Sequence, residues 1–597
     1  MSDSPAGHYQ RNIAAQSDKL QKLEALFSRL SVLRLIVFFG GGASVILLYN
    51  YYGPYSLSSV AVVLLIFIPL VRRSAKVEKE IAFCKALLTI NRNESAYLEG
   101  DLSPFSDGRE YISPDHPYSY DLDIFGLESL FQRVNRTCTS DGHLRLGSSL
   151  KKPFLDQNFI LQRQATVKEL SAQLDFRQRF LATAEVYSAG DYYRHEFETW
   201  LDGKSIFLHR KERWFWLVSP YLCAAFAVAP LFTQLSFIPF GISFFFQLFL
   251  TGRYVKNMGK LYARVSRLSG VFKMYGALLT ELESSSFNSV ELITIKNDLL
   301  HGKELPSRGI RKLFVILINL DAQLNVILAP ILNGLFLWNI HYTCQLERWK
   351  EQYRAQFPRW LDCLARIDEL ISVSNYAFNH PDFVFPELSE ANFAIHAASL
   401  AHPFLPLKIR IGNDFNFESE NLILLTGANM AGKSTFLRAV GLNIILGMTG
   451  LPVCARSLTF SPIEIYSSLR TSDSISKNES FFLAEIKKLK TIIELYEAGR
   501  KIFILLDEIL KGTNSKDQHL GSEQLIGKLL RLGVKGIIAT HDVDLGNLAR
   551  DHPSQILNAC FEVELHGDEF SFDYKLKPGV CQTMNASVLM RKMKIID

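Results

Sequence analysis

Residues 421–446 read NLILLTGANMAGKSTFLRAVGLNIIL, a short apolar run, a loop that contains two glycines, and a longer apolar segment. Within this stretch, residues 427–434 fit the pattern G-x-x-x-x-G-K-[ST] at every defined position. We predict a strand at residues 421–426 and a helix at residues 434–446. In that setting the pattern binds nucleotide phosphates, because glycines let backbone N–H groups surround a phosphate and the helix N-terminus adds its dipole. The sequence therefore predicts a P-loop inside an α/β domain.

The end of this loop supplies the two side chains that the chemistry needs. Lys433 is expected to bridge the β- and γ-phosphate oxygens, and the Ser434 hydroxyl is expected to bind Mg²⁺. The predicted cofactors are therefore ATP and Mg²⁺. The nucleotide-binding residues are predicted to be Gly427, Ala428, Asn429, Met430, Ala431, Gly432, Lys433, Ser434 and Thr435.

Two further apolar runs end in polar residues. The strand predicted at residues 501–506 is followed by Asp507 and Glu508, a placement that gives one acid for the magnesium shell and a second acid to activate water. We assign magnesium binding to Asp507 and the role of general base to Glu508. The strand predicted at residues 536–540 runs into His541, which could reach the γ-phosphate or the attacking water, or could be an ordinary hydrogen-bonded loop residue. The catalytic candidates are thus Glu508, Lys433 and His541.

Together these motifs resemble the MutS family of mismatch-repair ATPases. Residues 426–435 (TGANMAGKST) are similar to the family pattern T-G-P-N-M-x-G-K-S-T, with Ala428 in place of the proline. Residues 505–513 (LLDEILKGT) resemble L-L-D-E-I-G-R-G-T, and residues 539–541 match A-T-H. The resemblance implies an ABC-type ATPase domain, DNA as a partner, and a γ-phosphate sensor role for His541.

The resemblance also implies a dimer. Residues 478–485 (NESFFLAE) resemble the family segment S-x-F-x-x-E, whose serine reaches the γ-phosphate held by the partner subunit. Ser480 takes that role by resemblance, and a place as N-cap of the helix that follows is compatible with it. The resemblance covers residues 118–210 and 254–597 and is strongest after Leu425. With the role of Ser480, it implies a homodimer of MutS-like subunits.

The N-terminal part departs from that family. Members that detect mismatches carry an N-terminal domain with a Phe-x-Glu wedge, whereas this end of the chain is occupied by an apolar segment. The Phe-Pro-Glu at residues 385–387 lies just before the ATPase domain, in the wrong place for that role. Direct mismatch reading is therefore not expected.

Two long segments contain no Asp, Glu, Lys or Arg. Residues 35–71 are split by a Tyr-Tyr-Gly-Pro turn at 51–54, and residues 214–252 are split by Thr233 and Gln234 between two prolines. Each segment is predicted to be a transmembrane helical hairpin, which gives about four crossings. The alternative is a pair of buried hairpins in a soluble protein, but soluble helices of this length normally carry charge on one face.

Basic residues flank both segments. They are Arg29, Arg34, Arg72 and Arg73 at the first, and Arg210, Lys211, Arg213, Arg253 and Lys256 at the second. By the positive-inside rule, both chain termini and the ATPase domain are predicted to face the cytoplasm of a multi-pass membrane protein. Residues 322–346 are also uncharged, but they contain three asparagines, a proline and a glycine, so we expect a core helix there rather than a fifth crossing.

The predicted fold class is α followed by α/β. Its parts are a cytosolic segment (1–34), hairpin 1 (35–71), a helical MutS-like core (72–213), hairpin 2 (214–252), a helical lever and core region (253–400), and the P-loop ATPase domain (401–597). Long helices are predicted at residues 82–97, 167–187, 254–283, 310–342 and 346–376.

Composition leaves the partner open. The net charge of +5 permits contact with nucleic acid or lipid without requiring either, and the eight cysteines include no CxxC pair that would indicate a zinc site. Two hypotheses remain: a membrane-anchored MutS-like ATPase that binds DNA, or an ATP-driven membrane machine that does not act on DNA.

Overall fold

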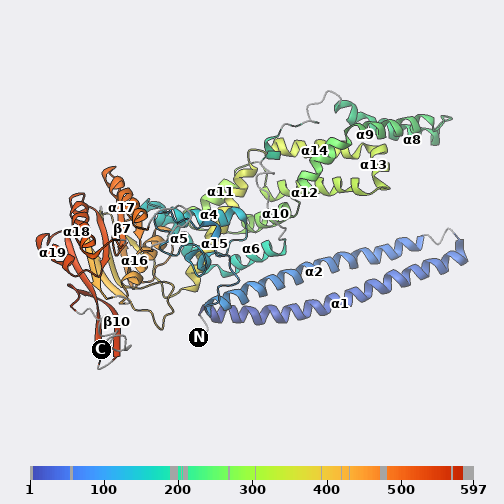
Figure 1. Ribbon diagram of the computed structural model, residues 1–597. Coiled ribbons are helices and arrows are strands. Elements are labelled where there is room, and N and C mark those ends of the chain that lie inside the picture. The colour runs from blue at the N-terminus through green and yellow to red at the C-terminus, as the bar shows by residue number, and fades with distance from the viewer. Residues whose placement is uncertain are drawn as a thin grey trace.

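Helices form the chain as far as Asn379, and two β-sheets follow, as a computed structural model of the protein shows (Figure 1). The last long helix ends at Asn379 and the first strand begins at Glu387, so the strands begin inside the segment 253–400 that we predicted to be a helical region. The structure describes residues 4–53, 58–187, 199–203, 205, 207, 213–266, 269–302, 304–391, 393–418, 420–428, 431–470, 481–511, 513–566 and 569–582.

The first two helices, α1 (Pro5–Tyr52) and α2 (Ser58–Leu98), form a long antiparallel hairpin (Figure 1). Ser4 caps the start of α1 by accepting a hydrogen bond from the Gly7 N–H, and Gly53, with φ of 59°, ends the helix. The end of the hairpin that carries the chain terminus lies against the helical body, whereas apolar side chains cover the other end and are exposed.

A second hairpin is made by α8 (Arg213–Phe232) and α9 (Ile238–Ser266). It projects from the body on the same side as the α1/α2 hairpin, away from the sheets (Figure 1). Its outer surface is apolar and exposed, including Phe232 and Phe245.

Three of the described helices are long and apolar enough to cross a membrane. They are α1, residues Trp214–Phe232 of α8, and residues Ile238–Ala263 of α9. The predicted second arm, in α2, is not among them; its uncharged part within the described residues is only 58–71, shorter than the ~20 apolar residues of an ordinary span. A bent pair, Pro306–Leu324 with Leu328–Phe336, would add a fourth candidate if it formed one span.

The body between the hairpins and the sheets is built around α15 (Phe357–Asn379), most of which is buried. Its acidic residues are satisfied internally: Asp368 accepts a 2.6 Å hydrogen bond from the Thr139 hydroxyl, and Glu369 pairs with Arg163 at 2.5 Å. The other helices of the body are α3 (Leu130–Val134), α4 (Ser140–Lys151), α5 (Gln157–Ala172), α6 (Leu174–Val186), α10 (Ser269–Ser284), α11 (Val290–Leu300), α12 (Pro306–Asp321) and α14 (Trp338–Tyr353), with a 3₁₀ turn at Arg109–Tyr111.

Several predicted helices are interrupted. The helix expected at residues 346–376 is divided between α14 and α15 by a turn at residues 354–356. The helix expected at residues 167–187 is divided between α5 and α6 at Gln173. Residues 322–346 are not the single core helix that we predicted: a 3₁₀ turn (Ala322–Leu324), α13 (Leu328–Phe336) and α14 follow one another, and the chain bends by 117° before α13. The cause is local, because the Asn325 side chain accepts hydrogen bonds from the N–H groups of Ile327 and Leu328 and so replaces helical bonds.

The larger sheet has the strand order β10-β9-β4-β8-β7-β6. All neighbouring pairs are parallel except the β9–β10 hairpin, which agrees with the α/β architecture predicted for this part of the chain. The strands are β4 (Leu422–Gly427), β6 (Glu464–Ser468), β7 (Ile502–Asp507), β8 (Lys535–Thr540), β9 (Ile556–His566) and β10 (Glu569–Pro578).

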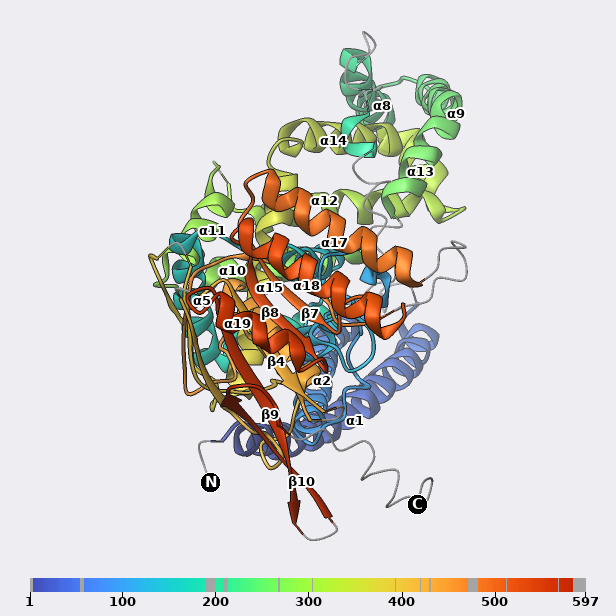
Figure 2. The ribbon, with the colours of Figure 1, turned by 60° about the vertical axis from the view of Figure 1, so that its left-hand side comes forward.

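Helices cover both faces of this sheet (Figure 2). Side chains alternate along each strand, so Leu425 and Leu505 belong to the core beneath α16 (Lys433–Met448), whereas Leu424 and Leu506 belong to the core beneath α17 (Phe481–Glu497) and α18 (Ser515–Arg531). A smaller sheet, of order β1-β5-β2-β3, lies beside it: β1 (Glu387–Leu388), β2 (Ile395–Leu400), β3 (Asn413–Phe417) and β5 (Ser457–Phe460). A 3₁₀ turn (Asp544–Asn547) and α19 (Leu548–Asp551) lead into β9.

Candidate functional site

The loop after β4 leads directly into α16, as the sequence predicts for a P-loop. Gly427 and Gly432 have φ of 155° and 106°, which side chains rarely allow. A Cβ at Gly427 would lie 2.8 Å from the Phe561 carbonyl oxygen, so neighbouring strand β9 also requires glycine there. Asn429 and Met430 lie outside the described residues.

Lys433, the first residue of α16, is buried and closes over the loop. Its ammonium donates hydrogen bonds to the carbonyl oxygens of Gly427, at 2.6 Å, and Ala428, at 3.0 Å. Burial lowers the pKa of Lys433, and the carboxylates of Glu508 and Asp507 oppose that shift. The ammonium is therefore held at the mouth of the loop, where the phosphates of a bound nucleotide would replace the carbonyls as its partners.

Ser434 and Asp507 meet at the carboxyl edge of the sheet. The Ser434 hydroxyl donates a short hydrogen bond to Asp507 Oδ2, and Asp507 Oδ1 is buried without a partner among the described residues. A hydroxyl and a carboxylate with a spare buried oxygen are the hard oxygen ligands that Mg²⁺ prefers. These two residues fit the predicted magnesium site.

Glu508 follows in an unusual backbone conformation, with φ of 53°. Its N–H donates to the Ala539 carbonyl oxygen at 2.8 Å, which fixes the residue against the end of β8. Its carboxylate lies 3.1 Å from Lys511 Nζ and 3.8 Å from His541 Nδ1. The structure thus brings the three catalytic candidates, Lys433, Glu508 and His541, to one edge of the sheet, and adds Lys511, which we noted only as part of a motif.

Helix α17 is anchored to the same edge by a buried acid. Glu485 accepts a hydrogen bond of 2.5 Å from the Leu510 N–H, and burial raises the pKa of its carboxyl. The acid that ends the S-x-F-x-x-E segment therefore ties α17 to the loop after β7. Ser480 lies outside the described residues, so its predicted role across a dimer stays a prediction.

A mainly apolar cavity of about 380 Å³ opens beside the P-loop. Burial lowers the pKa of His402, on its wall, to about 4, which keeps the imidazole neutral near pH 7. The Asn413 amide links two strands here by donating to the Tyr574 carbonyl oxygen at 3.1 Å. The lining residues are Leu400, Ala401, His402, Leu405, Ile409, Ile411, Asn413, Gly432, Thr435, Phe436, Ala439, Phe561 and Tyr574. Apolar walls with a few polar groups suit a nucleobase or another flat ring.

Of these lining residues, only Gly432 and Thr435 were predicted as site residues, because the other walls come from segments far apart in the chain. His402 and Asn413 belong to the smaller sheet and its connection, and Tyr574 belongs to β10. Spacing motifs describe one segment at a time, so only the fold reveals the set.

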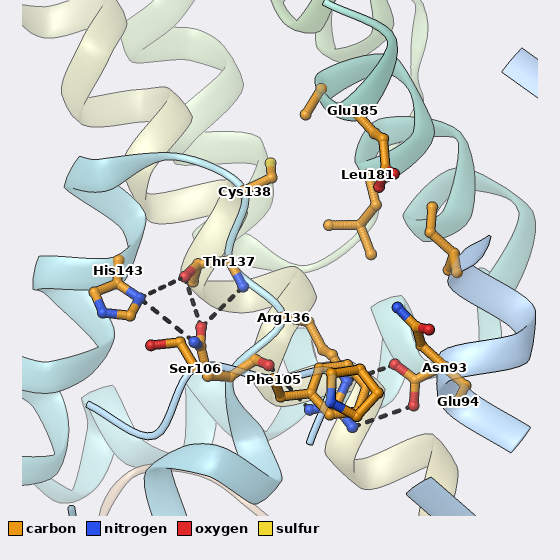
Figure 3. Close-up of a pocket in the computed structure, with 14 residues that line it drawn as sticks. Asn93, Glu94, Phe105, Ser106, Arg136, Thr137, Cys138, His143, Leu181 and Glu185 are labelled. Atoms are coloured by element: carbon orange, nitrogen blue, oxygen red, sulfur yellow. Dashed lines mark hydrogen bonds and ion pairs between the residues drawn. The ribbon is translucent and has the colours of Figure 1, made fainter. Parts of the chain in front are cut away.

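A second cavity, of about 480 Å³, lies where α2 meets the body (Figure 3). Arg136 and Glu94 form a buried ion pair of 2.5 Å, and the guanidinium lies 3.5 Å from the centre of the Phe105 ring. His143 lies on the opposite wall, within hydrogen-bonding distance of Asn135 and Thr137 (Figure 3). None of the predicted site residues lines this cavity, and its ion pair fastens the first hairpin to the body.

Comparison with known proteins agrees with this arrangement of loop, acids and sheet. Residues 423–592 match the family model of MutS domain V. The chain is 29% identical to the DNA mismatch repair protein msh3 of Aspergillus terreus over 241 residues, which are 38% of this chain and 21% of that protein. It is 30% identical to the DNA mismatch repair protein MutS of Thermotoga neapolitana over 221 residues (36% and 27%), and 30% identical to the Endonuclease MutS2 of Thermus thermophilus over 196 residues (32% and 25%).

The site and sheet define an α/β domain with a phosphate-binding loop, and the matches identify that domain as MutS domain V. The family match therefore applies to residues 423–592, the C-terminal part of the chain. The matched part spans about a quarter of the length of these relatives.

Proposed function

We propose that this protein is a membrane-anchored ATPase of the MutS type that acts on DNA. The observation that carries the ATPase part is the convergence of Lys433, Ser434, Asp507 and Glu508 at one edge of a parallel sheet. Phosphoryl transfer needs a positive group at the γ-phosphate, a metal shell and a residue that orients water, and these residues supply each one.

In this proposal the chain's own residues divide the work. Lys433 turns from the loop carbonyls to the β- and γ-phosphate oxygens and compensates their charge. Ser434 and Asp507 hold Mg²⁺, which neutralises charge on the phosphates when bound. Glu508 accepts a proton from the attacking water, and His541, next to its carboxylate, lies within reach of the same water.

Glu508 also has to be released before it can act as a base. Its carboxylate is paired with Lys511, and an ion-paired carboxylate is a weaker base than a free one. We infer that nucleotide binding, by drawing Lys511 or Lys433 toward the phosphates, frees Glu508 for the water.

The proposal for DNA rests on the relatives. Two of them are named DNA mismatch repair proteins and one is named an endonuclease, but the match is confined to about a quarter of each. The second candidate, an ATP-driven membrane machine that does not act on DNA, is favoured by the two apolar hairpins, whose exposed apolar helices suit a membrane and not a DNA surface.

A single assay separates these two candidates. We expect purified full-length protein to hydrolyse ATP, and we expect duplex, mismatched or branched DNA to change the rate. ATP hydrolysis that none of these DNAs alters, combined with no DNA binding in the presence of ATP, would favour the membrane machine. Absence of hydrolysis under all conditions would contradict the ATPase proposal itself.

Membrane anchoring is proposed from the exposed apolar ends of the hairpins. In the most apolar stretch of α1 only 6% of the residues are buried, and in those of α8 and α9 only 17%. Water-exposed apolar surface of this extent is unfavourable, at roughly 25 cal/mol per Å². The two hairpins project on the same side of the body, so one bilayer could hold both (Figure 1).

A further inference from the structure

The short helix α13 lies beside the middle of the α8/α9 hairpin. Cys223, midway along α8, donates a hydrogen bond from its thiol to the Gly334 carbonyl oxygen at 3.7 Å. Phe244, midway along the uncharged part of α9, lies directly against Gly334, where no Cβ would fit. Gly334 is therefore at the same height along the hairpin as its central residues, and any medium that surrounds the middle of the hairpin must also surround α13.

The chain reaches this position from the body and returns to the body. Before it, the Tyr262 hydroxyl donates to Asp321, at the end of α12, at 2.5 Å. After it, Leu337, just before α14, and Ile340 of α14 pack with Trp216 at the base of the hairpin. Helices α12 and α14 then run side by side, joined by a 2.7 Å hydrogen bond from the Trp349 indole N–H to the Gly309 carbonyl oxygen. The segment thus enters and leaves on one side.

Asparagine side chains satisfy backbone groups where the helices are broken. Asn333 is buried; its amide donates to the Ala329 carbonyl oxygen at 2.8 Å and accepts from the Asn339 N–H at 2.9 Å, which bridges the break at Leu337. Asn325 accepts from two N–H groups in the turn before α13. An unsatisfied backbone group in the acyl-chain region costs several kcal/mol, and these side-chain hydrogen bonds remove part of that cost at the breaks.

The outer surface of the segment is apolar. Val326 and Ile327 are 86% and 79% exposed, Leu324 and Ile331 are exposed as well, and residues 322–346 include no charged side chain. Nothing in the described part of the chain covers these side chains. An exposed apolar patch beside an exposed apolar hairpin forms one continuous surface for the same partner.

We propose that residues 322–336 form a re-entrant membrane element, which enters the acyl-chain region of the bilayer beside the α8/α9 hairpin and returns to the same side. This inference rests on the proposed membrane anchoring and adds to it a lipid-contacting segment that neither crosses the membrane nor belongs to the core.

Charge on the neighbouring helices is consistent with this orientation. A groove of about 600 Å³ between α12 and α14 is lined on the body side of the segment by Arg308, Arg311, Lys312 and Arg348, together with Glu304, which pairs with Lys312 at 2.8 Å. Arg311 precedes Asp321 by about 15 Å along α12, at 1.5 Å per residue. Basic side chains at that height would face the phosphates of anionic lipid headgroups.

Photocrosslinking to lipid tests the proposal. The full-length protein, reconstituted in vesicles of phosphatidylcholine and phosphatidylglycerol, would carry the photoreactive residue p-benzoylphenylalanine at Ile327, at Phe245 or at Leu127. Phe245, 69% exposed, reports on the hairpin, and Leu127, 75% exposed in the body, is the matched control away from it. We expect lipid adducts by mass spectrometry at Ile327 and Phe245 and not at Leu127.

The other outcomes separate the two levels of the proposal. Adducts at Phe245 without adducts at Ile327 would overturn the re-entrant element and leave the anchor intact. Adducts at neither position would contradict the membrane anchor. Crosslinks from Ile327 to a second copy of the chain would assign the surface to a protein interface and overturn the proposal.

A topology measurement distinguishes re-entry from a crossing. Cysteines placed at Val290, before the segment, and at Glu351, after it, should both react with a membrane-impermeant maleimide from the same side of the vesicle. Both residues are exposed in the structure. Reaction from opposite sides would show that the segment crosses the bilayer, which would overturn re-entry.

Discussion

At the scale of single residues, the loop after β7 holds two side-chain-bearing residues in the left-handed region. Glu508 has φ of 53° and Leu510 has φ of 59°. For residues other than glycine this conformation costs roughly 1–2 kcal/mol each. Such strain persists where the surrounding contacts enforce it, and here the hydrogen bonds to Ala539 and Glu485 do so. The strained backbone conformation thus occurs at Glu508, the residue that we propose as the general base.

Lys433→Met should abolish ATP hydrolysis. The substitution keeps an unbranched apolar stem but removes the ammonium that compensates charge on the γ-phosphate, and loss of such a group lowers turnover by at least about tenfold. Turnover of purified protein, measured as phosphate release, checks this. Near-normal turnover would remove Lys433 from the site.

Glu508→Gln should preserve ATP binding and lower hydrolysis by about 10²- to 10⁴-fold, because the amide keeps the shape of the side chain and cannot take a proton from water. Nucleotide binding by fluorescence titration and phosphate release would be measured on the same preparation. Equal loss of binding and turnover would place Glu508 in the metal shell instead. Asp507→Asn is the matched control, and we expect it to weaken the dependence of binding on Mg²⁺.

Sequence alone reached much of this site and missed the rest for a physical reason. Lys433, Ser434, Asp507 and Glu508 follow directly from strand ends in a parallel sheet, which always meet at one edge. The Lys511 ion pair and the cavity lined by His402 and Asn413 depend on how a loop folds back and on how the second sheet lies beside the first. No periodicity or spacing encodes those placements.

At the scale of elements, side-chain hydrogen bonds decide where helices end. The apolar pattern of residues 310–342 predicts one helix, but Asn325 and Asn333 satisfy backbone groups from within the chain and make the breaks possible. The pattern was a poor guide there because a segment that is apolar on all sides carries no information about its buried face. The uniformly apolar composition made the two hairpins easy to recognise in the sequence, but it gave no indication of where α13 begins and ends.

Gly334→Leu should destabilise the unit formed by α8, α9 and α13. A Cβ at this position would overlap the Phe244 ring, and overpacking of this kind costs about 1–3 kcal/mol. Gly241→Leu is the matched control, since nothing lies within 4 Å of a Cβ at Gly241 on α9. Thermal unfolding in detergent micelles should show a lower midpoint for the first variant only. Equal midpoints would mean that α13 does not pack on the hairpin.

At the scale of the whole molecule, polar contacts connect the first hairpin to the helical body, and the body to the α/β domain. Glu94 of α2 accepts from the Asn379 amide at 2.8 Å, and Asn379 accepts from the Tyr9 hydroxyl of α1 at 2.7 Å, so both arms of the first hairpin are tied to the end of α15. At the other junction, Asp123 of the body pairs with Arg438 of α16 at 3.3 Å. If α16 moves when nucleotide binds, the Asp123–Arg438 ion pair connects that movement directly to the body.

The proposed topology predicts which residues an external reagent reaches. Cysteines at Tyr52 and Thr233, at the far ends of the hairpins, should react with a membrane-impermeant reagent from outside, because the positive-inside rule places the basic ends on the cytoplasmic side. Ser74 itself is buried, so the inner probes are cysteines at its exposed neighbour Ala75 and at Ser205, which should react only after the membrane is permeabilised. Labelling at Ala75 from outside would contradict the orientation.

Assembly is the last property that the whole molecule must explain. A P-loop site alone leaves one side of the γ-phosphate open to water, and closure by a second subunit would exclude solvent and strengthen each electrostatic contact there. Helix α17, which follows Ser480, is tied to the edge of the sheet through Glu485, next to the proposed base.

Ser480→Ala should therefore lower turnover and leave nucleotide affinity nearly unchanged. Mixed with Lys433→Ala subunits, it should form heterodimers in which one site carries both lesions and the other is intact, so activity should exceed the sum of the two separate variants. Differently tagged chains would first show that the subunits exchange. A mixture no more active than that sum would then mean either that the sites are not shared or that one intact site cannot work alone. A mixture of wild-type and Lys433→Ala subunits separates these two results, because activity beyond that of the wild-type homodimers requires a single site to turn over.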